Sequence, residues 1–249
     1  MSKLSEAPMA NSLVQISRDL SAAVDELLFS SPVTHIYNPL SYARSPHEAY
    51  LKLFGRGRKR VVFLGMNPGP FGMAQTGVPF GDVQTVGEWL GIDQPVGMPR
   101  DPHPRRPVQG LECPRVEVSG QRLWGWVKHH WQTPEAFFLE AFVANYCPLV
   151  FLEDSGRNRT PNRLPLGERR PLFEVCDRAL RRTVECLNPD WVVGIGAFAA
   201  LRATEVLSGN GRRIGKILHP SPASPAANRG WQQVAERQLT DQGIFEFGG

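Results

Sequence analysis

A short apolar strand that ends in a rigid polar loop constrains this chain more than any other feature. Residues 61–64 form a continuous apolar run closed by Gly65, the pattern of a strand buried on both faces of a parallel sheet. The next segment, Asn67-Pro68-Gly69-Pro70, cannot continue the strand, because proline lacks an amide hydrogen and asparagine and glycine favour turns. Open α/β sheets carry their functional groups at such carboxyl ends, so Asn67 is the first candidate site residue.

Further apolar runs repeat this pattern and define the predicted fold. We expect strands over residues 137–145, 191–195 and 213–218, and two of them run into a polar residue and a turn, at Asn145 and His219. Apolar residues at helical spacing predict helices over residues 12–28, 45–54, 85–90, 121–131, 171–187, 196–207 and 231–239. Strands alternating with helices indicate an α/β protein with a four-stranded parallel sheet covered on both faces. Right-handed crossovers would place all the strand ends on one side.

Three segments fall outside this pattern. Residues 92–115 are rich in proline and predict a long irregular excursion, and loops of that length inside a domain are more often functional than accidental. Residues 153–170 are polar, basic and rich in turn formers, and residues 1–11 are typical of a flexible tail. We expect a single domain over residues 1–249.

Charge and cysteine usage narrow the class of protein. The net charge of +4 is compatible with a polyanionic partner, although many basic proteins have none. The four cysteines show no C-x-x-C pair and no spacing typical of zinc ligands, so we expect neither a metal ion nor a cofactor. We find no signal peptide and no apolar run long enough to span a membrane. We therefore expect a cytoplasmic or nuclear protein that is monomeric and has no membrane partner.

The predicted sheet edge presents Asn67, Asn145 and His219 but little other catalytic machinery. It has no paired carboxylates, nucleophile elbow, phosphate-binding loop or dinucleotide fingerprint. Amides and an imidazole can orient water, read the edge of a heterocycle and stabilise developing negative charge. From the residues alone, the chain is an α/β enzyme or a nucleotide-binding module. On the same basis Asn67 is more often a turn residue than a functional one, and Phe80 would be a core aromatic.

Two longer motifs are more specific. GMNPGPFGMAQTGVPFGD at 65–82 and HPSPASPAANRGW at 219–231 closely resemble the signature motifs of the single-strand-selective monofunctional uracil-DNA glycosylases, and the similarity extends over residues 37–231. The resemblance implies a three-layer α/β/α sandwich around the four-stranded parallel sheet. It also implies base-excision repair of single- and double-stranded DNA by hydrolysis of the bond between uracil and deoxyribose. The location would follow the DNA: the nucleus in a eukaryote, the nucleoid-containing cytoplasm in a prokaryote.

The resemblance also assigns roles to individual residues. Asn67 would position the attacking water, His219 would donate to uracil O2, Asn145 would read the base edge, and Phe80 would stack on the base. The base pocket would be completed by Met66 and Gly69, and the loop over residues 69–81 would accept a 5-hydroxymethyl group and refuse thymine. The motifs contain no catalytic lysine, which fits a monofunctional enzyme that leaves an abasic site.

The second motif would supply a loop that fills the space left by the extruded base, called here the wedge loop (residues 220–228). Its expected DNA contacts, with the residue that follows it, are Ser221, Pro222, Ala223, Ser224, Pro225, Asn228 and Arg229. Animal members of the family carry arginine where this chain has Ala223, so the wedge loop would penetrate less or Arg229 would take over. Two alternatives stay open: a related glycosylase that prefers deaminated purines such as xanthine, and an inactive binder of damaged bases.

Overall fold

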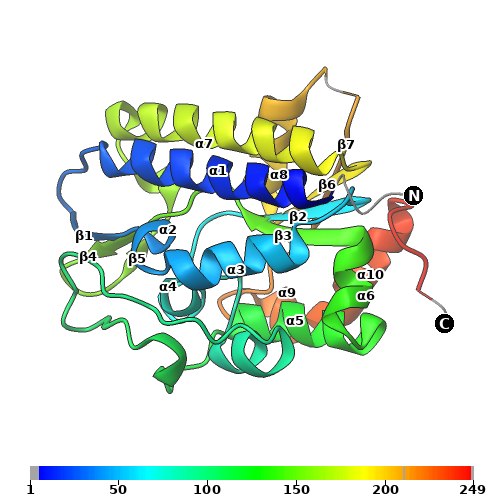
Figure 1. The fold of residues 1–249 in the computed structure, drawn as a ribbon, viewed down its shortest axis with the longest axis horizontal. Coiled ribbons are helices and arrows are strands. Elements are labelled where there is room, and N and C mark those ends of the chain that lie inside the picture. The colour runs from blue at the N-terminus through cyan, green and yellow to red at the C-terminus, as the bar shows by residue number, and fades with distance from the viewer. Residues whose placement is uncertain (1–5, 210, 248–249) are drawn as a thin grey trace.

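Four parallel strands in the order β3-β2-β6-β7 form the centre of the molecule (Figure 1). The computed structural model describes residues 6–209 and 211–247. The strands are β2 (Val61–Gly65), β3 (Ala141–Asn145), β6 (Trp191–Ile195) and β7 (Arg213–Ile217). Gly65 lies opposite Asn145 in the register of β2 and β3, so these two strands end at the same edge of the sheet.

Helices cover both faces of this sheet, which confirms the α/β/α sandwich. In Figure 1, α1 (Glu6–Asp25), α7 (Leu166–Leu187) and α8 (Ala197–Leu207) lie on one side, and α5 (Val118–Trp131) lies on the other with α10 (Trp231–Asp241). The remaining helical segments are α2 (Pro39–Tyr42), α3 (Arg44–Phe54), α4 (Met73–Thr76), the π-helix η1 (Thr85–Trp89), η2 (Gly110–Glu112), α6 (Pro134–Glu140), η3 (Pro161–Arg163) and α9 (Pro225–Asn228). No helix among the described residues is long and apolar enough to cross a membrane.

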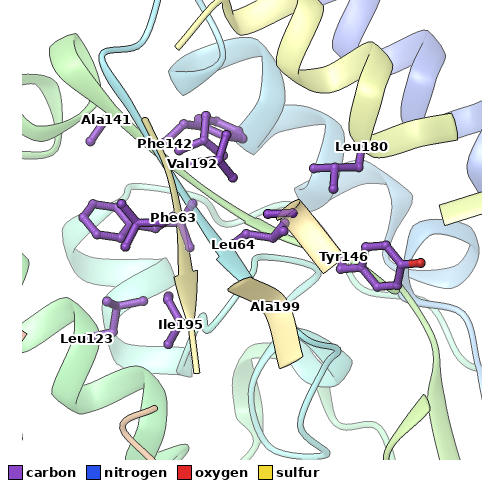
Figure 2. Close-up of a cluster of buried hydrophobic side chains, with 14 of the residues drawn as sticks. Phe63, Leu64, Leu123, Ala141, Phe142, Tyr146, Leu180, Val192, Ile195 and Ala199 are labelled. Carbon is purple, nitrogen blue, oxygen red and sulfur yellow. The ribbon is translucent and has the colours of Figure 1, made fainter. Parts of the chain in front are cut away.

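The core lies on both faces of β2, as its unbroken apolar run predicts. Residues 61–64 are at most 1% exposed. Phe63 and Leu64 point to opposite sides of the strand, Phe63 toward α5 and Leu64 toward the α7 face (Figure 2). Burying each such side chain contributes about 1.5–3 kcal/mol, so the strand that precedes Asn67 is firmly anchored.

A second sheet, which the sequence pattern did not reveal, stands beside the first. It is antiparallel, in the order β1-β4-β5, and comprises β1 (Val33–Tyr37), β4 (Val150–Glu153) and β5 (Asn158–Arg159). Tyr37 pairs with Val150, more than a hundred residues away, and periodicity within a short window carries no signal for such a pairing. The second sheet places residues 158–160 beside the carboxyl end of β2.

Three predicted boundaries were wrong by four residues or more. The expected strand 137–145 is helical up to Glu140, because Thr133 caps α6 by accepting from the Ala136 amide and Pro134 occupies the first turn. The expected helix start at Pro171 lies five residues late, and the proline is tolerated inside α7 at the loss of one helical hydrogen bond. The expected tail 1–11 overlaps α1, which begins at Glu6, and residues 1–5 lie outside the described part. The irregular excursion is confirmed, since residues 92–115 hold only η2.

Candidate active site

A cavity of about 320 Å³ opens at the carboxyl ends of β2 and β3. It brings together residues from segments far apart in the chain, including Asn67, Asn145 and His219, as the strand order predicts. The full lining is Met66, Asn67, Pro68, Gly69, Gly72, Met73, Phe80, Glu117, Ser119, Asn145, Asn158, Thr160, His219 and Ser221.

Asn67 follows β2 and is held in a fixed orientation. Its Nδ2 donates to the carbonyl oxygen of Leu149 at 3.1 Å, which ties the end of β2 to the segment leading into β4. None of the described residues donates a hydrogen bond to its Oδ1. The amide oxygen is therefore available to a group in the cavity, such as a water molecule.

Asn145 ends β3 and presents its amide edge to the cavity. Its Nδ2 donates to the sulfur of Met73 at 3.4 Å, a weak acceptor, and its Oδ1 is buried with no donor among the described residues. A buried acceptor without a partner costs free energy unless a ligand supplies a donor. The space that Asn145 occupies exists because its neighbour Gly65 has no side chain: a Cβ there would lie 2.3 Å from Asn145 Oδ1.

Phe80 and His219 form the aromatic part of the cavity. Their ring centroids are 6.1 Å apart, with the planes tilted by 43°. Phe80 has a left-handed backbone, with φ of 56°, and its carbonyl oxygen packs so closely on Gly120 that a Cβ there would lie at 2.0 Å. Trp231 fixes the residue before His219 through a bond from its Nε1 to the Leu218 carbonyl oxygen at 2.7 Å.

Burial lowers the pKa of His219 below its ordinary value of 6.5. The imidazole is therefore neutral at physiological pH, with one ring nitrogen as a donor and the other as an acceptor. A neutral histidine can still donate one N–H hydrogen bond to an oxygen that gains negative charge.

Met66 and Gly69 also line the cavity, as predicted. The Met66 carbonyl oxygen accepts from the Cys147 amide at 2.9 Å, so the backbone there is part of the β2–β3 junction. Gly69 leaves room for a carboxyl group, since a Cβ on it would lie 2.5 Å from Glu117 Oε2.

Several lining residues were missed by reasoning from sequence. Glu117 directly precedes α5 and lines the cavity. Burial raises the pKa of its carboxyl group, and hydrogen bonds from Ser119 partly offset this rise. Asn158 donates from Nδ2 to the Pro68 carbonyl oxygen at 3.2 Å, while its Oδ1 is buried and finds no donor in the described residues. Glu117 lies four residues before the predicted helix 121–131, so no sequence signal indicated it. Asn158 arrives on the unforeseen second sheet.

The predicted DNA-contacting residues lie together beside the cavity, and Ser221 alone among them forms part of its lining. Ser224 caps α9 by accepting from the Ala227 amide at 3.4 Å. Pro222, Ala223, Pro225, Asn228 and Arg229 are exposed. The wedge loop is therefore a compact, capped surface feature at the mouth of the cavity.

The arrangement suits hydrolysis or recognition of a planar heterocycle. It supplies amide oxygens and nitrogens, a neutral imidazole, an aromatic ring and a buried carboxyl group. Over residues 6–209 and 211–247, no three His, Cys, Asp or Glu side chains are grouped so that they could hold a metal ion.

Comparison with known proteins places this geometry in a family. Residues 52–239 match the family described as the Uracil DNA glycosylase superfamily. The chain is 48% identical over 239 residues to the single-strand selective monofunctional uracil DNA glycosylases of Mus musculus and Bos taurus, covering 95% of this chain and 86% and 88% of theirs. The crystal structure of wild-type SMUG2 from Pedobacter heparinus superposes with a TM-score of 0.67 at 18% identity, covering 94% of this chain and 97% of that one, a likeness of fold.

Proposed function

The chain belongs to the uracil DNA glycosylase superfamily, and from that premise we propose that it is a monofunctional uracil-DNA glycosylase of base-excision repair. It hydrolyses the bond between uracil and deoxyribose and leaves an abasic site. The observation that carries the proposal is the meeting of Asn67, Phe80, Asn145 and His219 around one cavity at the sheet edge. Its volume of about 320 Å³ suits a single extruded base better than a larger ligand.

The unpartnered amide edge of Asn145 supports a preference for uracil over cytosine. Uracil presents an N3–H donor beside the O4 acceptor, which complements the oxygen and nitrogen of a carboxamide. The buried Oδ1 would accept from N3–H, and Nδ2 would exchange the weak Met73 sulfur for O4. Cytosine has an acceptor at N3 and a donor at C4, so it would leave the same amide unpaired.

His219 and Phe80 would act on the base as it departs. Phe80 offers a face on which the pyrimidine can stack. As the glycosidic bond breaks, negative charge grows on the base, and a neutral His219 donating to O2 stabilises it without a proton having to be transferred. Removing one donor of this kind typically costs about 2.7–4 kcal/mol of transition-state stabilisation.

Asn67 would orient the water that attacks the sugar. Its Nδ2 is occupied by the Leu149 carbonyl oxygen, which leaves Oδ1 to accept from the water. A carboxamide is a poor base, so most of the acceleration would come from positioning and from the preorganised polar groups around the base. Extrusion of the base from the DNA stack costs a few kcal/mol and is cheapest in single strands and mismatches.

Finer features of the activity are also proposed. The loop over residues 69–81 would admit uracil and 5-hydroxymethyluracil and refuse thymine, and the enzyme would act as a monomer on single- and double-stranded DNA. It would work where the DNA is, in the nucleus of a eukaryote or the cytoplasm of a prokaryote.

The decisive experiment uses a single-stranded oligonucleotide with one uracil, incubated with the protein and then treated with alkali to cleave abasic sites. We expect cleavage at the uracil only after alkali. A strand that stays intact while still binding the protein would identify an inactive binder of damaged bases. Faster release of xanthine than of uracil would identify the deaminated-purine alternative. The same assay on oligonucleotides that carry 5-hydroxymethyluracil or thymine in place of uracil ranks the 5-substituents by their rate of release.

A further inference from the structure

Arg122 of α5 connects the body of the protein to both ends of the wedge loop. Its Nη1 donates to the carbonyl oxygens of Pro220 at 3.1 Å and Ser221 at 3.3 Å, and its Nη2 donates to Asn228 Oδ1 at 2.8 Å. Asn228 in turn donates from Nδ2 to the Pro222 carbonyl oxygen at 2.9 Å. A single guanidinium therefore closes the loop on itself and attaches it to a helix.

The same helix also contacts the base cavity. Glu117, the residue that precedes α5, lines the cavity, and Gly120 in its first turn packs against the Phe80 carbonyl oxygen. Arg122 lies two residues after Gly120. The position of the wedge loop and the position of the stacking ring are thus set by neighbouring residues of one rigid element.

We propose that Arg122 is a positioning residue that holds the wedge loop in place for duplex DNA. The proposal rests on the proposed function. A duplex closes again over an extruded base unless the gap is filled, so a loop that can swing away loses most of its effect there. A single strand has no partner strand to re-pair with, and extrusion costs less. Loss of the Arg122 bonds should therefore reduce activity on duplex DNA more than on single strands.

The fork shape of the guanidinium makes the proposal specific for arginine. Arginine can donate to three acceptors in one plane, whereas the lysine ammonium is a compact charge that reaches fewer of them. Arg122→Lys keeps the charge near the DNA but loses the fork. An effect of Arg122 through charge alone would be restored by lysine, and an effect through loop geometry would not.

The test measures kcat/KM for uracil release from a single strand and from the matching duplex. For Arg122→Ala we expect the duplex value to fall about tenfold more than the single-strand value, and for Arg122→Lys we expect most of that loss to remain. Asn228→Ala should lower the duplex value similarly, and the double variant should be no worse than the poorer single variant, because both break the same connection.

Arg212 provides a matched control at the opposite end of the sheet. It donates from Nη1 to the Pro189 carbonyl oxygen at 2.9 Å and from Nη2 to Asn188 Oδ1, the same kinds of acceptor, in the loop before β6. Arg212→Ala should leave the ratio of duplex to single-strand activity unchanged. Melting temperatures of all variants identify any that are merely unfolded.

Three outcomes would overturn the proposal. They are an unchanged ratio in folded Arg122→Ala, full recovery of the ratio by Arg122→Lys, and additive losses in the double variant. A wild-type protein that releases no uracil from a single strand would instead refute the proposed function, so the two failures are distinguishable.

Discussion

Substituting Gly65 by alanine should damage the active site without disturbing the fold. Gly65 ends the central strand β2, and its φ is not positive, so alanine fits its backbone. An added Cβ would lie 2.3 Å from Asn145 Oδ1 and 2.5 Å from Phe80 Cε2. The strand cannot move away, because it is paired with β3 and β6 and the Gly65 carbonyl oxygen accepts from the Tyr146 amide at 2.9 Å.

The size of the effect follows from these distances. Ordinary van der Waals contact begins at 3.4 Å, so the Asn145 amide must retreat by about 1.1 Å (3.4 − 2.3) and the Phe80 ring by about 0.9 Å (3.4 − 2.5). Misplacing a reacting group by about 1 Å can cost about 100-fold in rate. We therefore expect Gly65→Ala to lower the rate of uracil release about 100-fold, equivalent to about 2.7 kcal/mol.

Single-turnover release of uracil from a single-stranded oligonucleotide, followed by alkali cleavage, measures the rate. Gly125→Ala in α5 is the matched control, because nothing lies within 4 Å of its added Cβ. It should keep the wild-type rate and raise stability by about 0.5–1 kcal/mol, the usual gain when alanine replaces glycine inside a helix. A Gly65→Ala protein that melts normally and stays within threefold of the wild-type rate would refute the reasoning.

Further predictions concern catalysis and pH. Asn67→Ala and His219→Ala should each slow uracil release by about 100- to 1,000-fold while DNA binding in a gel-shift assay survives; wild-type rates in both would refute their proposed roles. Burial lowers the pKa of His47 from 6.5 to about 4. The buried neutral imidazole therefore contributes stability that is fully present above pH 6.5 and is lost as the pH falls through 4. We expect the free energy of unfolding, measured with urea, to fall by about 3 kcal/mol over this pH range, and His47→Gln should remove that pH dependence. Burial raises the pKa of Glu117 above 4.5, so its ionised form destabilises the fold as the pH rises. Glu117→Gln should therefore melt higher at pH 8 and not at pH 4; an equal gain at both would contradict this.

The parts of the fold set by local pattern could be predicted from sequence. The strands β2, β6 and β7 agree with prediction to within a residue, because each is a short apolar run bounded by turn residues. The helix α6 was missed because Glu140 alone separates its apolar residues from those of β3, and only Thr133 and Pro134 at its start mark the helix. The second sheet was missed because its strands pair across long stretches of chain.

The same distinction applies to the active site. Asn67, Asn145 and His219 could be expected to converge, since parallel strands deliver their ends to one edge. Their roles came from a resemblance in the motifs and stay predictions. Glu117 and Asn158 reach the cavity through tertiary contacts, and no motif indicated them. The bonds of Arg122 to the wedge loop join residues about a hundred positions apart, which sequence spacing alone does not reveal.

The left-handed backbone of Phe80 has a kinetic consequence. A non-glycine residue at φ of 56° is held there only by its surroundings, so the backbone of Phe80 is already fixed before any DNA arrives. Little backbone freedom of this residue remains to be lost when a base enters, so we expect no slow rearrangement of Phe80 at that point. The lifetime of the extruded nucleotide, a property of the nucleic acid, should then govern how quickly a productive complex forms.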